Sequence, residues 1–211
     1  MANTNRTFLE LQEAVQSDMQ LNPGLISATE RKQFINDALA DLGKLNVFEK
    51  SDTLTSVDGY ITTPSDYVSI ITLRWVGSGR LLIPTRIPDS TIGISSNPIY
   101  YIEQGNTIEL LPKPTIDGDV DMFYNYRPSK LVEDTDQPDV PNGYDNLLVD
   151  YAIAFCHRKN GEIGLFREYK SNYDVGRIEL STELLRQKNS RITIRRNTAD
   201  MGLPLTPFDY L

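Results

Sequence analysis

Apolar residues recur every three or four positions in four stretches of the chain, and this spacing predicts four helices. The strongest pair lies in residues 142–188, where Gly161 and Gly164 separate two apolar runs. These runs consist of Leu147, Leu148, Tyr151, Ala152 and Phe155, and of Phe166, Tyr169, Tyr173, Gly176, Leu180 and Leu184. Two packed helices joined by a short turn are expected. Gly176 falls on the apolar face, which predicts a close crossing of two helices.

Two further helices are expected near the N-terminus. Thr7 can cap the first, and Asn22-Pro23-Gly24 marks the turn after it. Ser27 and Glu30 form a capping-box pattern ahead of the second helix, which weakens at Gly43. The two apolar stripes are Phe8, Leu11, Val15 and Met19, and Phe34, Ile35, Ala38, Leu42 and Leu45. We expect these helices to pack on the pair at 142–188.

The pattern changes between residues 51 and 139. Gly and Pro recur too often for helices there, and the segments between them are rich in β-branched and aromatic residues. Gly105-Asn106 is a hairpin turn signal between residues 99–103 and 107–111. Strict alternation over residues 119–126 predicts a strand with one covered face. A strand is also predicted over residues 67–76, with one face made by Tyr67, Ile71, Leu73 and Trp75.

The predicted fold class is therefore α+β, with a discontinuous four-helix bundle, an inserted antiparallel β sheet or small barrel, and an extended C-terminal tail. The bundle takes residues 1–50 and 140–190, the β domain takes 51–139, and the tail takes 190–211. Exposed apolar side chains in such a tail favour a segment laid on a neighbouring molecule. The predicted partner-docking arm consists of Arg191, Ile192, Ile194, Arg195, Arg196, Leu203, Leu205, Phe208, Tyr210 and Leu211.

Charge is distributed unevenly along the chain. The net charge of -8 argues against nonspecific binding of nucleic acid by the whole surface. Residues 186–196 nevertheless carry no acid and five cations, namely Arg186, Lys188, Arg191, Arg195 and Arg196. Two interpretations stay open: a solvated basic helix end that complements the helix dipole, or a docking segment for an acidic partner or for DNA phosphates.

Candidate catalytic groups are few. Cys156 is the only cysteine, so no internal disulfide can form, and its neighbour His157 is the only histidine. Adjacent residues on a helix point about 100° apart, so we expect a buried thiol and a helix-surface imidazole instead of a nucleophilic pair. Asp134, Asp136 and Asp139 lie in an acidic loop over residues 131–141, but the spacing of a calcium loop is missing. We predict no catalytic, cofactor-binding or metal-binding residues and no enzymatic activity.

No apolar run approaches the roughly 20 residues that a membrane-spanning helix needs. The first residues also lack a basic start followed by a hydrophobic segment. We therefore expect no membrane contact and a cytoplasm-like compartment.

Three motifs in a fixed order resemble a known family. Residues 59–67, Gly-Tyr-Ile-Thr-Thr-Pro-Ser-Asp-Tyr, resemble the opening of a strand in which Thr63 stands where Leu is more usual. Residues 108–114 and 117–128 resemble a pair of strands, and a helix pair is marked by Pro141, Tyr144, Leu147, Leu148, Tyr151, Ala152, Phe166 and Tyr173. Over residues 5–188 the chain is similar to the head-to-tail adaptor proteins of tailed bacteriophages, also called connector or head-completion proteins.

The resemblance implies a structural virion protein of the phage neck, assembled in the host cytoplasm. Such a subunit forms a homo-oligomeric ring, usually of 12 copies, beneath the portal protein and joins it to tail or nozzle proteins. DNA passes through the lumen during genome ejection without specific binding. The alternatives are a tail-completion or neck protein of similar build, and a small hydrolase that uses acids such as Asp145 and Asp150.

Overall fold

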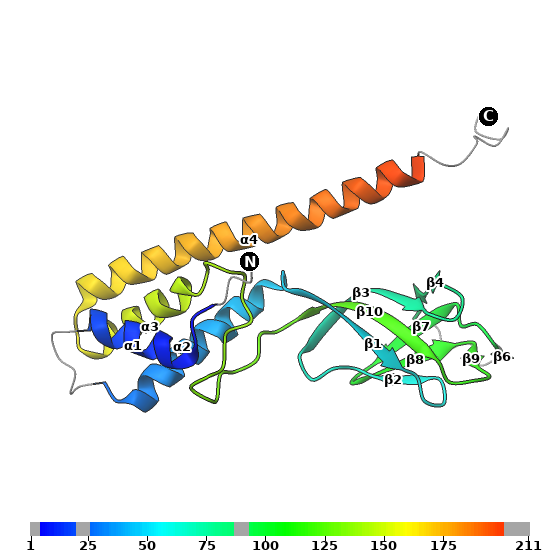
Figure 1. Cartoon of the computed structure of the whole chain (residues 1–211), viewed down its shortest axis with the longest axis horizontal. Helices are drawn as coiled ribbons and strands as arrows, with labels where there is room; N and C mark the ends of the chain where they lie inside the picture. The colour runs from blue at the N-terminus through cyan, green and yellow to red at the C-terminus, as the bar shows by residue number, and fades with distance from the viewer. Residues whose placement is uncertain (1–4, 20–25, 87–92, 201–211) are drawn as a thin grey trace. The chain divides into compact units, whose positions relative to one another are not determined.

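The computed structural model describes residues 5–19, 26–86 and 93–200, with side chains described as far as Lys188. The chain is a mixed α+β protein, as predicted, and divides into two compact units (Figure 1). The helical unit comprises residues 1–38 and 132–211, and the β unit comprises residues 39–131. These boundaries differ from the expected 50/51 and 139/140, because residues 39–50 group with the strands and residues 132–139 group with the helices.

The helices begin where their capping residues predict. Helix α1, Phe8–Asp18, starts after Thr7, whose hydroxyl accepts a hydrogen bond from the Glu10 backbone while the Glu10 carboxylate accepts one from the Thr7 backbone. Ser27 and Glu30 make the same reciprocal pair before α2, Ala28–Leu42. Gly43 ends that α-helix, and residues Gly43–Leu45 form the 3-10 helix η1. The predicted cap at Thr7, the predicted capping box of Ser27 and Glu30, and the weakening at Gly43 are confirmed.

Helices α3, Asn146–Lys159, and α4, Ile163–Asp200, form the predicted pair. Aromatic rings join them: Tyr151 meets Tyr173 edge-on with 5.0 Å between ring centroids, and Phe155 meets Phe166 at 5.9 Å. A Cβ atom on Gly176 would overlap the Leu147 side chain, so the predicted close crossing at this glycine is confirmed. Helix α1 also packs on α3, and α2 reaches it through Phe34 and Phe155, whose rings lie 6.0 Å apart.

The β unit contains two four-stranded sheets and a two-stranded one. The first sheet has the order β1-β10-β3-β4 and consists of β1, Glu49–Thr55, β10, Asp119–Tyr126, β3, Tyr67–Trp75, and β4, Arg80–Leu81. The second has the order β2-β8-β7-β5 and consists of β2, Tyr60–Thr62, β8, Thr107–Leu111, β7, Tyr100–Gln104, and β5, Ile83–Pro84. The short strands β6, Ile94–Ser95, and β9, Lys113–Pro114, pair with each other. The pairs β5–β7 and β6–β9 are parallel, and the other pairs are antiparallel.

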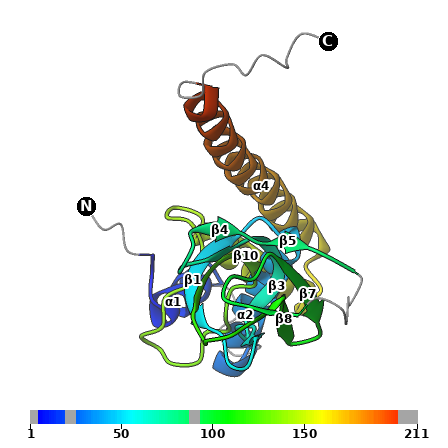
Figure 2. The same cartoon turned by 90° about the vertical axis from the view of Figure 1, so that its right-hand side faces the viewer.

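Alternation in the sequence places the core of the β unit. Along β10, buried and solvent-facing positions alternate, and the buried residues are Val120, Met122, Tyr124 and Tyr126, as predicted. The predicted hairpin is present as well, because β7 and β8 pair around Gly105-Asn106, where Gly105 has a φ of 62° (Figure 2). The Tyr124 hydroxyl donates to Asp52 Oδ2 at 2.6 Å, and burial is the first cause that raises its pKa.

Helix α4 is longer than the sequence pattern suggested. The predicted tail begins at residue 190, but the backbone is helical through Asp200, so an extended conformation for residues 190–200 is wrong. The apolar stripe that predicted the helix ends at Leu184, because that stripe serves only the part of α4 that has α3 beside it. Residues 201–211 lie outside the described part of the chain.

Candidate functional site

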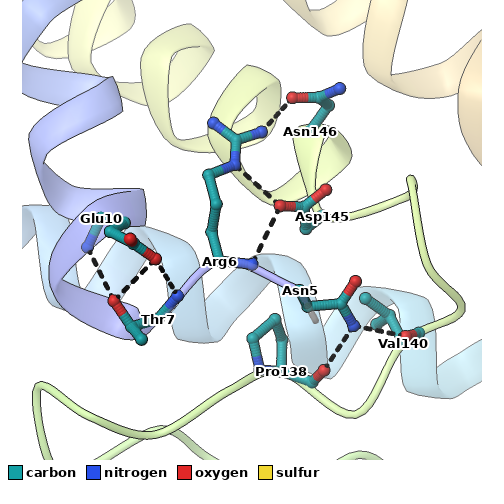
Figure 3. A network of polar contacts seen from close by, with 8 residues as sticks. All are labelled: Asn5, Arg6, Thr7, Glu10, Pro138, Val140, Asp145 and Asn146. Carbon is teal, nitrogen blue, oxygen red and sulfur yellow. Dashed lines mark hydrogen bonds and ion pairs between the residues drawn. The ribbon is translucent and has the colours of Figure 1, made fainter. Parts of the chain in front are cut away.

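The start of the chain is bound to the start of α3 by a polar network (Figure 3). Arg6 Nε donates to Asp145 Oδ2 at 2.7 Å, and the Arg6 guanidinium also donates to the Asn146 side chain. Asn5 Nδ2 donates to the carbonyls of Pro138 and Val140, at 3.0 and 2.7 Å. Asp145 is buried, so its charge needs the arginine. The network therefore joins the two segments of the helical unit, which are separated in sequence by the β unit.

This network bears on the hydrolase alternative, which uses Asp145 and Asp150. Asp145 is occupied by Arg6, whereas Asp150 lies on the wall of an open groove of about 520 Å³. Burial raises the Asp150 pKa, nearby Asp18 raises it further, and Arg6 opposes the shift. The groove lies between α1 and α3, and its lining residues are Arg6, Ala14, Ser17, Asp18, Asn146, Val149 and Asp150. Such a lining can receive a cationic or hydrogen-bonding side chain.

The Cys156 and His157 pair is not on the surface. Cys156 is buried, as predicted, and burial raises its pKa to about 11, so the thiol stays protonated near neutral pH. His157 was expected as a helix-surface imidazole, and that expectation is wrong. Its ring is buried, with Nδ1 2.5 Å from Glu162 Oε2, and it stacks on Tyr169 at 5.5 Å between ring centroids. The turn between α3 and α4 supplies Glu162, so the histidine fastens that turn.

Hydrogen bonds to the side chains of Asp134 and Asp136 hold the acidic loop in place. Asp134 accepts hydrogen bonds from Lys32, at 2.7 Å, and from Gln12. Asp136 accepts from the backbone amides of Val132 and Glu133, at 2.7 and 2.9 Å. These bonds lower the pKa of both carboxyls. Within residues 5–19, 26–86 and 93–200, no three His, Cys, Asp or Glu side chains group in a way that could hold a metal ion.

The backbone of this loop also caps α1. The amide of Phe8 donates to the Asp136 carbonyl at 2.8 Å, and the amide of Leu9 donates to the Asp134 carbonyl at 3.0 Å. The first amides of a helix have no partner inside it, so these two bonds satisfy groups that would otherwise need water. The loop is therefore a fixed part of the helical unit, and the sequence had shown only its acidity.

The residues of the predicted docking arm fall into two groups. Arg191, Ile192, Ile194, Arg195 and Arg196 lie on the helical backbone of α4. Leu203, Leu205, Phe208, Tyr210 and Leu211 lie outside the described residues. Whether these ten residues dock on a partner stays a prediction.

Helix α4 runs past the end of its partner helix. The Tyr144 hydroxyl donates to Glu183 Oε2 at 2.5 Å, just ahead of the first residue of α3. Because the two helices are antiparallel, residues 185–200 of α4 extend past the first residue of α3. At about 1.5 Å per residue this length is about 25 Å of helix. It coincides with the basic segment of residues 186–196.

A second apolar line on α4 was missed by the sequence interpretation. Val175, Ile178 and Leu185 are 54%, 67% and 46% exposed, although each is a large hydrophobic residue. They lie opposite Tyr173 and Leu180, which are fully buried. The spacing of these residues could have revealed the line. Val175 and Ile178 are three residues apart, and Ile178 and Leu185 are seven apart, which places all three on one helix face that differs from the face of the buried stripe.

These features define a class of protein. A helical unit with an inserted β unit, a long helix that outruns its packing partner and large exposed apolar side chains are typical of a subunit that assembles with other proteins. In the described part of the chain, no helix is long and apolar enough to cross a bilayer.

The comparison with protein families identifies that class further. The chain belongs to the SU10 adaptor protein family, whose model matches residues 6–200, and the predicted resemblance to phage head-to-tail adaptors is confirmed. Membership gives the chain a structural role in a bacteriophage virion, in the neck where portal and tail meet. A comparison with curated proteins found no match.

Proposed function

We propose that this adaptor forms a ring of about 12 copies beneath the portal, joins the portal to the tail or nozzle proteins, and lines the channel through which DNA leaves the head. The helical unit, packed as a bundle, makes the lateral contacts. The end of α4 and the residues after it dock on the portal, and the β unit faces the tail proteins. The net charge of -8 suits a channel wall, because like charge discourages binding to phosphates.

The observation that carries this proposal is the part of α4 that extends beyond α3. A helix gains most of its stability from a packed apolar face, so about 25 Å of helix beyond α3 needs another surface. The five cations of residues 186–196 indicate that this surface is acidic. A portal surface of that charge would satisfy both requirements.

The β unit offers a separate docking surface. Val57, Ile94 and Ile116 are exposed, and hydrogen bonds between neighbouring residues bring their segments together. The Asp58 amide donates to Asp117 Oδ1 at 2.9 Å, and the Thr115 amide donates to the Ser95 carbonyl at 3.1 Å. Exposed apolar residues gathered from three segments favour contact with another protein, and we assign them to the tail side.

The test is loading of purified subunits onto purified portal, measured by the mass of the complex. The full chain is expected to load as a ring of about 12 copies, and a chain without residues 190–211 is expected to lose most of its binding. A chain without residues 201–211 separates the helix end from the residues beyond it. Normal loading of the 190–211 deletion would overturn the portal assignment.

The tail-side assignment needs its own variant. Ile116→Asp should leave portal loading unchanged and reduce addition of tail proteins to the portal–adaptor complex, because it places a charge in the apolar cluster. Leu81→Asp, at another exposed apolar position of the β unit, is the matched control. A tail-completion or neck protein would instead bind a completed neck and not bare portal.

A further inference from the structure

The exposed line on α4 has the spacing of a coiled-coil seam. Val175, Ile178, Thr182 and Leu185 follow one another at intervals of three, four and three residues, and the same spacing continues in sequence at Asn189 and Ile192. These are the a and d positions of a heptad. Tyr173 and Leu180, both fully buried, take the f positions on the opposite side of the helix. One face of α4 therefore builds its own unit, while Val175, Ile178 and Leu185 expose large apolar side chains on the other.

Thr182 does not interrupt this seam. Its hydroxyl donates to the Ile178 carbonyl at 2.8 Å, so the polar atom is satisfied within its own helix. Val175, Ile178 and Leu185 then provide a mostly apolar strip. With Ile192, the strip spans about 26 Å at about 1.5 Å per residue.

The charges beside the seam identify the partner. Asp174 and Glu179 flank its first half, and Arg186, Lys188 and Arg195 flank its second half. Consider two antiparallel α4 helices whose seams meet with Thr182 of one copy opposite Leu185 of the other. The residues that flank the seam then face each other, with Glu179 beside Arg186 of the second copy and Asp174 beside Arg195 of the second copy. Both pairs carry opposite charges, and each occurs twice by symmetry.

A parallel pair is disfavoured by the same charges. There, Asp174 would face Glu179 of the second copy, which is a like-charge contact. Its opposite-charge pair, Arg195 with Asp200, lies at the last residue of α4. The antiparallel order also matches the seam, because Val175 meets Ile192, Ile178 meets Asn189, and Thr182 meets Leu185.

We propose that α4 of a second copy of this chain covers the exposed seam in antiparallel orientation, forming a dimer of the unassembled subunit. This inference does not require the proposed ring. A ring needs all copies to point the same way, so the antiparallel pair has to separate before assembly. About two and a half heptads with Thr and Asn in the seam give a weak, reversible dimer, which suits such an exchange.

Disulfide trapping tests the orientation. Val175→Cys and Ile192→Cys chains are prepared separately, and each is oxidised alone and in an equal mixture. The antiparallel dimer predicts rapid cross-linking only in the mixture, and native Cys156 is buried and does not interfere. Cross-linking of each variant with itself would show a parallel pair, and cross-linking in none of the three samples would show no pair. Either result overturns the proposal.

Charge reversal provides an independent test by sedimentation equilibrium. Glu179→Arg alone and Arg186→Glu alone should each weaken the dimer by about tenfold, because each sets like charges together at two symmetric contacts. The double variant should restore dimerisation, since both contacts regain opposite charges. Asp139→Arg, an exposed acid in the loop before α3, is the control and should not change it. A wild-type chain that stays monomeric at high concentration, or a double variant without recovery, contradicts the proposal.

Discussion

The two units of this protein hold together in different ways. The β unit is one continuous segment, residues 39–131, and its two largest strand pairs, β1–β10 and β10–β3, join residues such as Glu49 with Asn125 and Trp75 with Val120. The helical unit is made of two segments, and bonds such as Arg6 to Asp145 join residues 139 positions apart. Closing a long loop costs conformational entropy, and the Arg6–Asp145 bond closes a longer loop than the strand pairs of the β unit do. The comparison teaches that an inserted unit can make its long-range contacts within one stretch of chain, whereas its host needs contacts that span the insertion.

The largest effect is expected from emptying either core. Leu148→Ala in α3 and Met122→Ala in β10 each remove a fully buried side chain, which costs about 2–5 kcal/mol. The single tryptophan, Trp75, is in the β unit, so its fluorescence follows that unit, and circular dichroism follows mainly the helices. Leu148→Ala should shift the helical transition and Met122→Ala the fluorescence transition. Equal shifts of both signals by both variants would show one cooperative unit.

Gly176 provides the next test. Gly176→Val should destabilise the helical unit by about 1–3 kcal/mol, because the new side chain collides with Leu147 where α3 and α4 cross. Gly164→Ala, in the same helix with open space around it, is the control and should be neutral or slightly stabilising. Chemical denaturation followed by circular dichroism measures both. A neutral Gly176→Val would contradict the close crossing.

Breaking the Arg6–Asp145 ion pair, which joins the two segments of the helical unit, should lower the free energy of unfolding by less. Asp145→Asn keeps the shape of the side chain but removes the charge that Arg6 pairs with, and we expect a loss of about 1–2 kcal/mol in the helical unit. Asp139→Asn, at an exposed position of the same connection, should change nothing. The same denaturation experiment with Trp75 fluorescence should show the β unit unaffected. A shifted Trp75 transition would mean that the two units unfold together.

The smallest effect is expected on acidification. In the helical unit, a hydrogen bond from Lys159 is the first cause that lowers the Glu30 pKa, to about 2, and Glu10, Asp134 and Asp136 also have lowered pKa values. A pKa lowered in the folded state gives stability that is present above the unfolded pKa and is lost as the pH falls through the folded one. Asp150, whose pKa is raised, acts in the opposite direction.

Among the carboxyls of the β unit, Asp121 has a lowered pKa, and the hydrogen bond from Arg74 is the first cause. The helical unit should therefore lose more stability than the β unit between about pH 4.5 and pH 2. Thermal unfolding across this range, followed by the same two signals, checks the difference. Glu30→Gln should flatten the helical profile, and an unchanged slope would rule out the Glu30 contribution.

Local sequence signals predicted most of the elements. Thr7 and Ser27 fixed two helix starts, Gly105-Asn106 fixed a hairpin, and alternation over residues 119–126 gave the buried face of β10. Each depends on bonding or spacing within a few residues, so one segment carries enough information. Gly176 was predictable for the same reason, since only a close neighbour explains a glycine on an apolar helix face.

What the sequence did not show depends on partners far along the chain. Burial of His157 requires Tyr169 on the next helix, and the role of Asp145 requires Arg6. The predicted helix was shorter than α4 because the buried apolar stripe ends at Leu184. A second apolar line, which is exposed, includes Leu185. A helix that serves two partners shows two superposed periods, and an interpretation limited to one core detects only one.

The main-chain bonds from Phe8 and Leu9 to the carbonyls of Asp136 and Asp134 have an evolutionary consequence. Carbonyl oxygens are present whatever the side chain, so these two bonds do not depend on which side chains residues 134 and 136 carry, although the contacts of the Asp134 and Asp136 carboxylates do. The junction between the returning chain and the start of α1 is thus held by main-chain atoms. Related adaptors would then keep this junction even where the side chains of the loop differ.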